Sequence, residues 1–530
     1  MRTTYFPASP LATRTSQVHL LFLFIAAFLI AAFGSKINGG PPAAGVHDEF
    51  GYILAAETYA QGKLAMPRHP VWQAFESFHI LASPSYASKY PPAQSVFLAV
   101  GIWLGHPVYG VWLSTSLLAV GISWMLLPLG NPRLAYGLGL WSALWFGGLN
   151  YWAQSYWGGA PTALGAVLVW GGLLRLNSSL SRSAALSLGA GAGLLFLTRP
   201  FEGFLACLVP LVFVYAGLWR SAQAKDFRLI GKFVAIAALP VLGAFAFQAS
   251  INHAVTGSFA RLPYQEYNSQ YESVPILFFQ TREDPKDFRH PRMEQFDYEL
   301  RENEGYFTAP LYSVIQSRLK AIREYYLGVL GIPLLAAAFF LARSRWIAPA
   351  TVSLFVCLSS VVLVYPSLLH YYAALVAPLA VLLYLGVGEI VSRGSRNMAT
   401  QLGLILIAGF LLIEIAMRGP FLLANRDIAN FRIYRQELIH HLENESGRHL
   451  VLVRYTSDAP SPHVEYVYNG ASIDEQNIVW ARWSEWGPNT PVFEYFQDRR
   501  FWMLEVGDGM PQLRAFEWRE PANPTSPTSP

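Results

Sequence analysis

The chain has 530 residues, of which 53% are hydrophobic and only 14% are charged. Soluble domains usually contain about 25% charged residues, so this composition indicates a membrane protein rather than a soluble one. The formal net charge is +4, and the basic residues stand mainly in short loops, so no nucleic-acid partner is expected. Cys207 and Cys357 both fall inside apolar stretches, which leaves no disulfide framework to predict.

Apolar stretches of about 17 to 25 residues, long enough to cross a bilayer as helices, recur along the chain. The sequence predicts eleven spans, of which the third and the fifth are shorter than this range. The first has no obvious small-residue cleavage site, so we interpret it as a retained helix rather than a signal peptide. The predicted spans are residues 17–34, 108–128, 136–150, 159–175, 183–198, 200–218, 233–250, 326–342, 347–365, 368–388 and 399–416.

Lysine and arginine concentrate in alternate loops between these spans. Loops rich in them tend to remain in the cytoplasm, which predicts a cytoplasmic N-terminus and a C-terminal segment on the outer side. The residues assigned to the cytoplasm are Arg2, Arg14, Arg133, Arg175, Arg182, Arg220, Lys225, Arg228, Lys232, Arg343, Arg345, Arg393 and Arg396.

The C-terminal segment has a different pattern from the membrane region. A helix is expected over residues 433–443, followed by β-rich runs at 449–455, 477–482 and 500–506 with helix-compatible stretches between them. This order favours a small α/β layer with a partly parallel sheet. Its many aromatic side chains either fill a core and rest on lipid headgroups or bind the face of a sugar.

The predicted fold is therefore mainly α, a polytopic helical bundle with a small C-terminal α/β domain on the outer side. Residues 1–16 form the cytoplasmic N-terminus, and residues 17–416 form the transmembrane domain with outer loops 35–107 and 251–325. Residues 417–520 form the α/β domain, and residues 521–530 are a disordered tail rich in Pro, Ser and Thr.

An acidic pair, Asp48 and Glu49, follows the first span at the start of a predicted amphipathic helix near the outer membrane surface. Carboxylates at a helix N-terminus are electrostatically favoured, so helix capping alone explains them. The alternative is that the pair deprotonates an acceptor hydroxyl or binds a divalent metal through oxygen ligands.

The first outer loop ends in the sequence SKYPP, which contains Lys89 and Tyr90. Pro91 and Pro92 fix an extended entry and then start a helix. That helix need not cross the membrane, because a crossing would turn every later basic loop outward. Lys89 is therefore expected near the level of lipid phosphates, where it either snorkels or holds a phosphate.

The sequence LTRPFEGF places Arg199 and Glu202 in a tight outer turn between two predicted spans. Ionisable residues at this depth are costly and are often functional. Arg199 either pairs with Glu202 or binds an anionic headgroup.

Two further outer turns carry aromatic groups: Tyr156 and Trp157 in the first, and His370 and Tyr371 in the second. Each turn is explained by an aromatic belt at the membrane interface. The functional interpretation gains weight because these turns converge on one side, together with an aromatic-rich flexible loop at 262–275.

The acidic pair after the first span, the KYPP segment, the RP turn and the run HYYAALVAP together resemble the GT-C superfamily of membrane glycosyltransferases. Within it, residues 15–416 look like the branch of protein O-mannosyltransferases and the aminoarabinose transferase of lipid A, grouped as family 39 or RgtA/B/C/D-like. Each motif is short, so the resemblance depends mainly on the order of the motifs along the chain and on their common position on the outer side of the membrane. The C-terminal α/β segment and the loop 251–325 depart from the well-characterised members.

The resemblance implies a polyprenyl-phosphate sugar donor and transfer on the periplasmic or lumenal side, and we expect an envelope lipid, glycan or protein as acceptor and a bacterial inner membrane. One base and one leaving-group cation indicate a single inverting displacement. It also implies Asp48 as general base, Glu49 as its partner or as a metal ligand, and Lys89 as a ligand of the donor phosphate. Arg199 as a second phosphate contact is an extension from its charge and position. Further substrate contacts are expected from Tyr90, Tyr156, Trp157, Glu202, His370 and Tyr371.

Two other functions fit the same sequence. A transporter or flippase of a lipid-linked substrate would also place charges at membrane depth, but it usually shows repeated halves and broken helices, which this sequence lacks. A non-catalytic envelope scaffold would act through its C-terminal domain. The sugar and the acceptor are not specified by the sequence.

Overall fold

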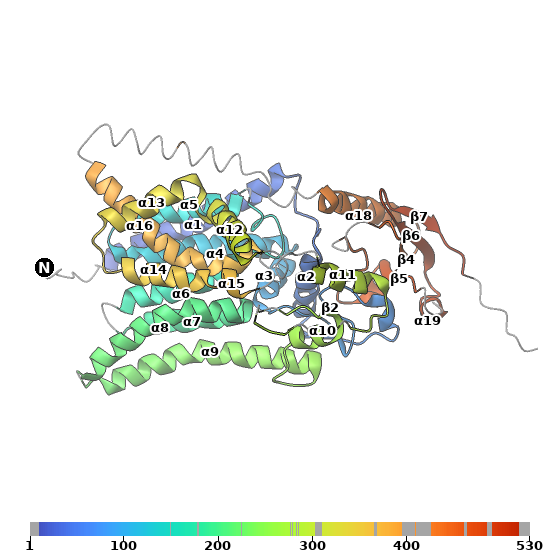
Figure 1. Ribbon diagram of the computed structural model, residues 1–530, viewed down its shortest axis with the longest axis horizontal. Helices are drawn as coiled ribbons and strands as arrows, with labels where there is room; N and C mark the ends of the chain where they lie inside the picture. Colours follow the sequence, from blue (N-terminus) through green and yellow to red (C-terminus); the bar gives the residue numbers. More distant parts are fainter. Residues whose placement is uncertain are drawn as a thin grey trace, which may run out of the picture.

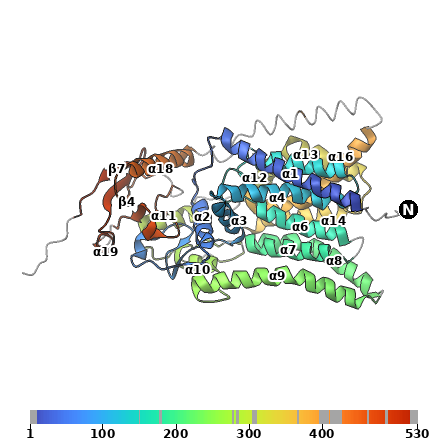
Figure 2. The same ribbon diagram turned by 180° about the vertical axis from the view of Figure 1, so that it is seen from behind.

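The computed structural model shows a mainly helical protein with a helical bundle at one end and a small sheet domain at the other (Figure 1). The first helix, α1 (Pro10–Ile37), begins at the bundle end that faces away from the sheet (Figures 1 and 2). The structure describes residues 10–148, 150–176, 180–223, 225–275, 277, 279–281, 284, 286–302, 310–364, 368–394, 409, 426–459, 464–484 and 490–518.

Ten of the eleven predicted spans correspond to helices of the bundle, and the span predicted at 399–416 lies outside the described residues apart from Gly409. Four of the described helices change pitch: α4 continues as a 3₁₀ turn, Leu127–Leu129, α5 continues as a π-helix, Ala143–Gly148, α13 follows a π-helix, Arg323–Leu327, and α16 follows a 3₁₀ helix, Leu369–Leu375. The bundle helices are α1 Pro10–Ile37, α4 Val108–Leu126, α5 Pro132–Ser142, α6 Ala160–Leu176, α7 Arg182–Thr198, α8 Pro200–Gln223, α9 Phe227–Thr256, α13 Gly328–Leu341, α14 Ile347–Leu358 with α15 Ser360–Leu363, and α16 Val376–Gly394.

By length and composition, five helical stretches in the described residues are long and apolar enough to cross a membrane. The number becomes six if α12 (Leu311–Ile322), its π-helical extension Arg323–Leu327 and α13 count as one span bent by 85°. Four shorter apolar helices accompany them. The span count and the orientation stay predictions.

Small residues allow the helices of the bundle to pack closely. A Cβ atom added at Gly191 of α7 would lie 2.6 Å from the carbonyl oxygen of Gly165 in α6, so the two backbones touch where both residues lack side chains. Close approach at small residues is a general means of packing helices in membranes.

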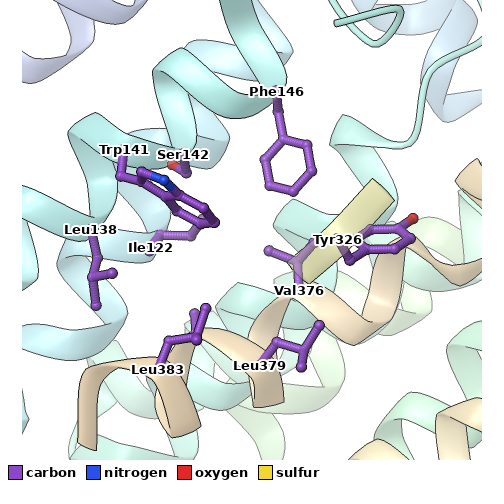
Figure 3. A pocket seen from close by; sticks show the side chains of 10 residues that line it. Ile122, Leu138, Trp141, Ser142, Phe146, Tyr326, Val376, Leu379 and Leu383 are labelled. Atoms are coloured by element: carbon purple, nitrogen blue, oxygen red, sulfur yellow. The ribbon is translucent and has the colours of Figure 1, made fainter. Parts of the chain in front are cut away.

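The bundle also contains a small apolar cavity between α4, α5 and α16 (Figure 3). Trp141, Phe146 and Val376 surround it, and none of the predicted site residues does. Its volume is about 20 Å³, which is room for little more than one water molecule.

The outer loops form a layer between the bundle and the sheet domain (Figures 1 and 2). The segment 262–275, expected as a flexible loop, is largely the helix α10, which begins at Pro263 in its favoured first-turn position. The elements of this layer are α2 His47–Ala60, β1 Met66–Pro67, a 3₁₀ turn Trp72–Phe75, β2 Ile80–Leu81, β3 Ser85–Ser88, α3 Ala93–Trp103, α10 Pro263–Tyr271 and α11 Pro291–Glu302.

Helix α3 is the helix that was predicted not to cross the membrane. It has 11 residues, which gives a length of about 16 Å at 1.5 Å per residue. A bilayer core is about 30 Å thick, so α3 alone is too short to span it.

The C-terminal domain has the predicted partly parallel sheet. Its strand order is β5-β4-β6-β7, with β4 parallel to both β5 and β6, and β7 antiparallel to β6. The strand β7 was not predicted. The elements are α18 Arg426–Asn444, β4 His449–Tyr455, a 3₁₀ turn Ile473–Glu475, β5 Ile478–Arg482, α19 Thr490–Tyr495, β6 Arg500–Val506 and β7 Gln512–Ala515.

This domain shares a hydrophobic core with the first outer loop. Leu54 of α2, Phe75 and Tyr86 pack in one cluster with Leu450 and Phe496 of the C-terminal domain. The loop and the domain therefore hold each other in place, and the sheet side supports the helix that carries the acidic pair.

Candidate functional site

Helix α2 begins directly after a run of glycine and proline residues. Gly39 and Gly40 adopt φ angles of 92° and 113°, which glycine reaches without strain, and Val46 is extended. The chain can therefore turn from α1 into α2, and this turn places Asp48 in the first turn of α2.

The Asp48 side chain is buried and bound from two sides. The hydroxyl of Tyr90 donates to its Oδ1, and Nδ1 of His47 lies 3.1 Å from its Oδ2. A carboxylate offers about four lone-pair positions, so these two contacts orient the group and still leave it able to accept a proton. Gly51 makes room for this arrangement, since a Cβ there would lie 3.1 Å from the ring of Tyr90.

A second histidine completes the group around Asp48. The ring centres of His47 and His79 are 4.5 Å apart, and the backbone N–H of His79 donates to the Tyr267 hydroxyl at 2.9 Å. His79 has a φ of 63°, a conformation that is unusual for a residue other than glycine. Phe296 of α11 covers both imidazoles.

The electrostatics of this group favour an ionised carboxylate. Burial by itself raises the pKa of Asp48, but the neighbouring His47 and His79 and the hydrogen bond from Tyr90 outweigh it and hold this pKa well below the usual value. Asp48 is therefore charged at neutral pH.

Lys89 lies next to this group, and the structure gives it a partner. Its Nζ is 2.5 Å from Oε1 of Glu272 and lies 4.8 and 4.5 Å from the ring centres of Tyr264 and Tyr267. Oε1 of Glu272 also lies 3.6 Å from Nδ1 of His79. The outer loop after α9 thus supplies a carboxylate that links the predicted phosphate ligand to the Asp48 group.

Arg199 stands at the end of α7 and packs against an aromatic ring. Its guanidinium carbon lies 3.5 Å from the centre of the Tyr371 ring. The described side chains of Arg199 and Glu202 form no ion pair within 4 Å, but the charge of Glu202 still helps to raise the pKa of Arg199. A guanidinium held by a ring face keeps its N–H donors for other groups.

The predicted residues are brought together around two tyrosines. Burial raises the pKa of Tyr52, Arg199 opposes this rise, and the charges of Asp48, Tyr371 and Glu202 add to it. Burial also raises the pKa of Tyr264. The charges of Glu272 and Tyr371 add to this rise, and that of Arg199 opposes it.

Asp48 and Arg199 thus act on one side chain, Tyr52, and Arg199 also acts on Tyr264, whose ring centre lies 4.8 Å from Nζ of Lys89. The acid, the lysine and the arginine therefore share one buried region. The parallel stack of Tyr52 on Tyr90, with ring centres 4.4 Å apart, joins its two sides.

Glu49 points to a different set of partners. Its Oε2 accepts hydrogen bonds from the N–H groups of Gly45 and Val46 and from Arg432 of α18, while its Oε1 accepts from the N–H of Tyr156. Both oxygens are occupied and the side chain is 0% exposed. The structure does not bring Glu49 into the Asp48 group, and it serves as a cap and an anchor.

The aromatic turns lie around the edge of the same region. Tyr156 is held through its backbone by Glu49 and Gln94, and Trp157 packs on His370 with ring centres 4.8 Å apart. Nδ1 of His370 and Nε1 of Trp157 are buried without a hydrogen-bond partner among the described residues. Such buried donors and acceptors are available to a bound molecule.

A metal ion would find its ligands in a different set from the one predicted. One ligand atom each from His47, Asp48 and His79 lies within 4.8 Å of the others, and all three residues are buried. Two imidazole nitrogens and one carboxylate oxygen suit zinc or iron better than calcium or magnesium. Glu49 does not belong to this set.

Sequence reasoning missed His47, His79 and Glu272. His47 precedes the acidic pair directly, and this adjacency was a usable signal. His79 and Glu272 reach the site through the path of two long loops, which no local pattern reveals.

No protein-family model matches the chain, and no curated protein matches it. Among solved structures, the chain is similar to ArnT from Cupriavidus metallidurans bound to undecaprenyl phosphate, with a TM-score of 0.48, 13% identity and 92% of each chain covered. ArnT in the apo state gives a TM-score of 0.47 and 12% identity, with 93% of each chain covered.

A third similar structure is the archaeal oligosaccharyltransferase AglB from Archaeoglobus fulgidus, in complex with an inhibitory peptide and a dolichol-phosphate. Its TM-score is 0.46 and its identity 13%, with 92% of this chain and 69% of that chain covered. All three TM-scores lie below 0.5, so these similarities say nothing about the chemistry of this chain.

Proposed function

We propose that the protein is an integral membrane glycosyltransferase, a hexosyl- or pentosyltransferase that uses a polyprenyl-phosphate sugar. The observation that carries the proposal is the buried, ionised Asp48 in one region with two cations, Lys89 and Arg199. The order of the sequence motifs supports the same conclusion. The acceptor is a hydroxyl of an envelope lipid, glycan or protein, and the site faces the periplasm of a bacterial inner membrane.

The reaction needs one base and one stabiliser of a leaving phosphate. Asp48 takes the proton of the acceptor hydroxyl while the acceptor oxygen attacks the anomeric carbon of the donor. The bond between that carbon and the phosphate oxygen breaks, and the polyprenyl phosphate leaves with the electron pair. A single displacement of this kind inverts the anomeric centre.

The two cations have unequal roles in this proposal. Arg199 has no carboxylate in an ion pair among the described residues, so its charge is available to the phosphate as negative charge develops. Lys89 shares its charge with Glu272 and contributes through the combined field of the pair. Tyr90 positions Asp48 and is not a reacting group.

A divalent metal fits the same mechanism in a supporting role. His47, Asp48 and His79 would hold it, and it would supply positive charge near the leaving phosphate. Because Asp48 would be one of its ligands, the ion would make this carboxylate a weaker base, whereas the contacts of Arg199 do not involve the ion.

The decisive experiment offers the purified full-length protein a panel of polyprenyl-phosphate hexoses and pentoses and measures donor hydrolysis and sugar transfer. Asp48→Asn is expected to reduce turnover by about 10²- to 10⁴-fold, the usual contribution of a general base. The control Asp458→Asn changes an exposed carboxylate in the C-terminal domain and should retain activity.

Two results would contradict the proposal. Full activity in Asp48→Asn would remove the catalytic role of this residue. Movement of the lipid-linked donor across proteoliposomes with no covalent product would identify a transporter instead.

A further inference from the structure

A second cavity lies between α2 and the C-terminal domain. Its volume is about 440 Å³, within the range of roughly 300 to 1,000 Å³ that small-molecule sites occupy. Phe50, Ile53, Leu54 and Glu57 of α2 form one wall. At 3.6 residues per turn, these side chains lie about half a turn around the helix from Asp48, so the cavity is separate from the site described above.

Arg435 of α18 lines this cavity among aromatic rings. Its guanidinium carbon lies 4.9 Å from the centre of the Phe50 ring and 5.3 Å from that of Trp480. One Nη2 hydrogen is donated to the carbonyl oxygen of Tyr468 at 3.2 Å. Nε is buried without a hydrogen-bond partner, and Arg435 forms no ion pair with a described carboxylate. The buried Nε–H is therefore unused among its five N–H donors.

The charge of Arg435 lacks compensation. Burial lowers the pKa of Arg435 to about 10, against the opposing effect of Tyr466 and Tyr468, so the guanidinium remains protonated at neutral pH. A partly desolvated cation without a counter-charge is costly. An anionic group bound beside it would remove this cost.

The remaining walls combine flat rings with hydrogen-bonding groups. Phe50 and Tyr468 are stacked, with ring centres 4.1 Å apart and an angle of 5° between the planes. Gln476 and Asn477 also line the cavity, as does the carboxylate residue Glu443, which forms no ion pair with Arg435 among the described residues. Glu57 adds a carboxyl group that accepts a hydrogen bond from the N–H of Ala471 at 2.8 Å.

Sugars match such a lining. A sugar ring has an apolar face that packs on aromatic rings, and its hydroxyls bond with amides and carboxyl groups. A neutral sugar would leave Arg435 uncompensated, whereas an acidic sugar would satisfy it.

We propose that this cavity binds an acidic saccharide, whose carboxylate or phosphate pairs with Arg435 while its ring lies against the aromatic wall. The bound unit lies on the far side of α2 from Asp48, so it belongs to a part of a glycan that is remote from any reacting hydroxyl. The proposal concerns binding and does not depend on the transfer reaction.

The test measures binding by calorimetry to the full-length protein in nanodiscs, without any sugar donor. The probes are the disaccharide of glucuronic acid and glucose, glucose 6-phosphate, the neutral disaccharide cellobiose and triglutamate. We expect at least one acidic sugar to bind at least tenfold more tightly than cellobiose, and comparison of the two acidic sugars distinguishes carboxylate from phosphate.

Three variants assign the effect to Arg435. Arg435→Gln should weaken the acidic sugar to the level of cellobiose, and Arg435→Lys should give an intermediate affinity because it keeps the charge but loses the planar fork. Arg514→Gln is the matched control, because Arg514 lies on β7 with its side chain 63% exposed, and it should bind like the wild type.

Several outcomes would overturn the proposal. They are equal affinity for cellobiose and both acidic sugars, unchanged binding of the acidic sugar in Arg435→Gln, or tighter binding of triglutamate than of any sugar. Arg435→Lys replaces Arg435→Gln in this test if Arg435→Gln does not fold. The proposal is then overturned if Arg435→Lys binds the acidic sugar as tightly as the wild type does and the wild type binds cellobiose equally well.

Discussion

The two faces of α2 shift the pKa of a buried carboxyl group in opposite directions. On the bundle side, His47 and Tyr90 lower the pKa of Asp48 in spite of burial. On the side of the C-terminal domain, burial raises the pKa of Glu57 above its usual value, and the hydrogen bond from Ala471 only partly opposes this. One helix thus holds an anion ready on one face and disfavours an anion on the other.

This difference shows that neighbours, more than burial, decide what a buried acid can do. Asp48 has imidazole and phenol groups around it, whereas Glu57 has mainly the backbone N–H of Ala471. The first arrangement suits proton transfer, and the second suits the binding of hydroxyl groups.

After the loss expected for Asp48→Asn, the largest effect on turnover is expected on the bundle side, from Arg199→Gln. This variant removes the cation that lacks a carboxylate ion pair among the described residues, and turnover should fall by roughly 10²- to 10³-fold, as when a charge-stabilising donor is lost. Sugar transfer from the polyprenyl-phosphate donor is the measurement. Arg220→Gln, which changes a basic residue near the end of α8, is the control. A loss of less than about threefold would exclude Arg199 from phosphate stabilisation.

A large effect of another kind is expected from Glu49→Gln. The variant weakens the charge-assisted contact with Arg432 and the hydrogen bonds from Gly45 and Val46. The free energy of unfolding should fall by about 2 to 3 kcal/mol, measured by thermal and denaturant unfolding in detergent. Turnover per folded molecule should change little. An equal loss of activity in Glu49→Gln and Asp48→Asn would mean that both acids react, and the distinction between them would fail.

A smaller effect is expected from Tyr90→Phe, which removes one hydrogen bond to Asp48. Because this bond helps to lower the pKa of Asp48, its loss should move the acid limb of the pH–rate profile to higher pH. Turnover at neutral pH should fall about tenfold, which corresponds to about 1.4 kcal/mol. A lower rate without any shift of the acid limb would show that Tyr90 does not act through Asp48.

The smallest effect is expected from Glu57→Gln on the opposite face. A raised folded pKa means that the protonated form of Glu57 is favoured on folding, and this contribution is lost as pH rises through the folded pKa. The variant should therefore gain thermal stability relative to the wild type as pH increases above about 4.5, the usual value.

Asp48→Asn serves as the comparison for Glu57→Gln. The depressed pKa of Asp48 stabilises the fold above its usual value of 3.8, and this contribution is lost as pH falls through the folded pKa. The variant should therefore be less stable than the wild type at neutral pH. If the difference in thermal stability between Glu57→Gln and the wild type does not change with pH, the contrast between the two faces of α2 is contradicted.

The sequence alone predicted most helices and the main strands of the C-terminal sheet, because apolar length and the β-rich runs are local signals. It also predicted that Asp48, Lys89 and Arg199 lie on the outer side of the membrane, because loops rich in lysine and arginine alternate along the chain and mark the cytoplasmic side. It did not separate Asp48 from Glu49. The separation arises from the turn of α2, which directs one acid to His79 and the other to Arg432.

The contacts that could not be predicted join distant parts of the chain. Lys89 meets Glu272 across 183 positions, and no periodicity encodes such a pair. The cavity beside Arg435 was beyond prediction for the same reason, because its two walls come from α2 and the C-terminal domain.

The anchoring of α2 has a consequence for how the protein reaches its active form. Glu49 is bound by Arg432, 383 positions later, and Glu57 by Ala471, 414 positions later. Until the C-terminal domain has docked, the helix that carries Asp48 lacks these supports. Under the proposed function, a chain inserted in the membrane but not yet completed would hold Asp48 without these supports, so sugar transfer would begin only after the C-terminal domain has docked.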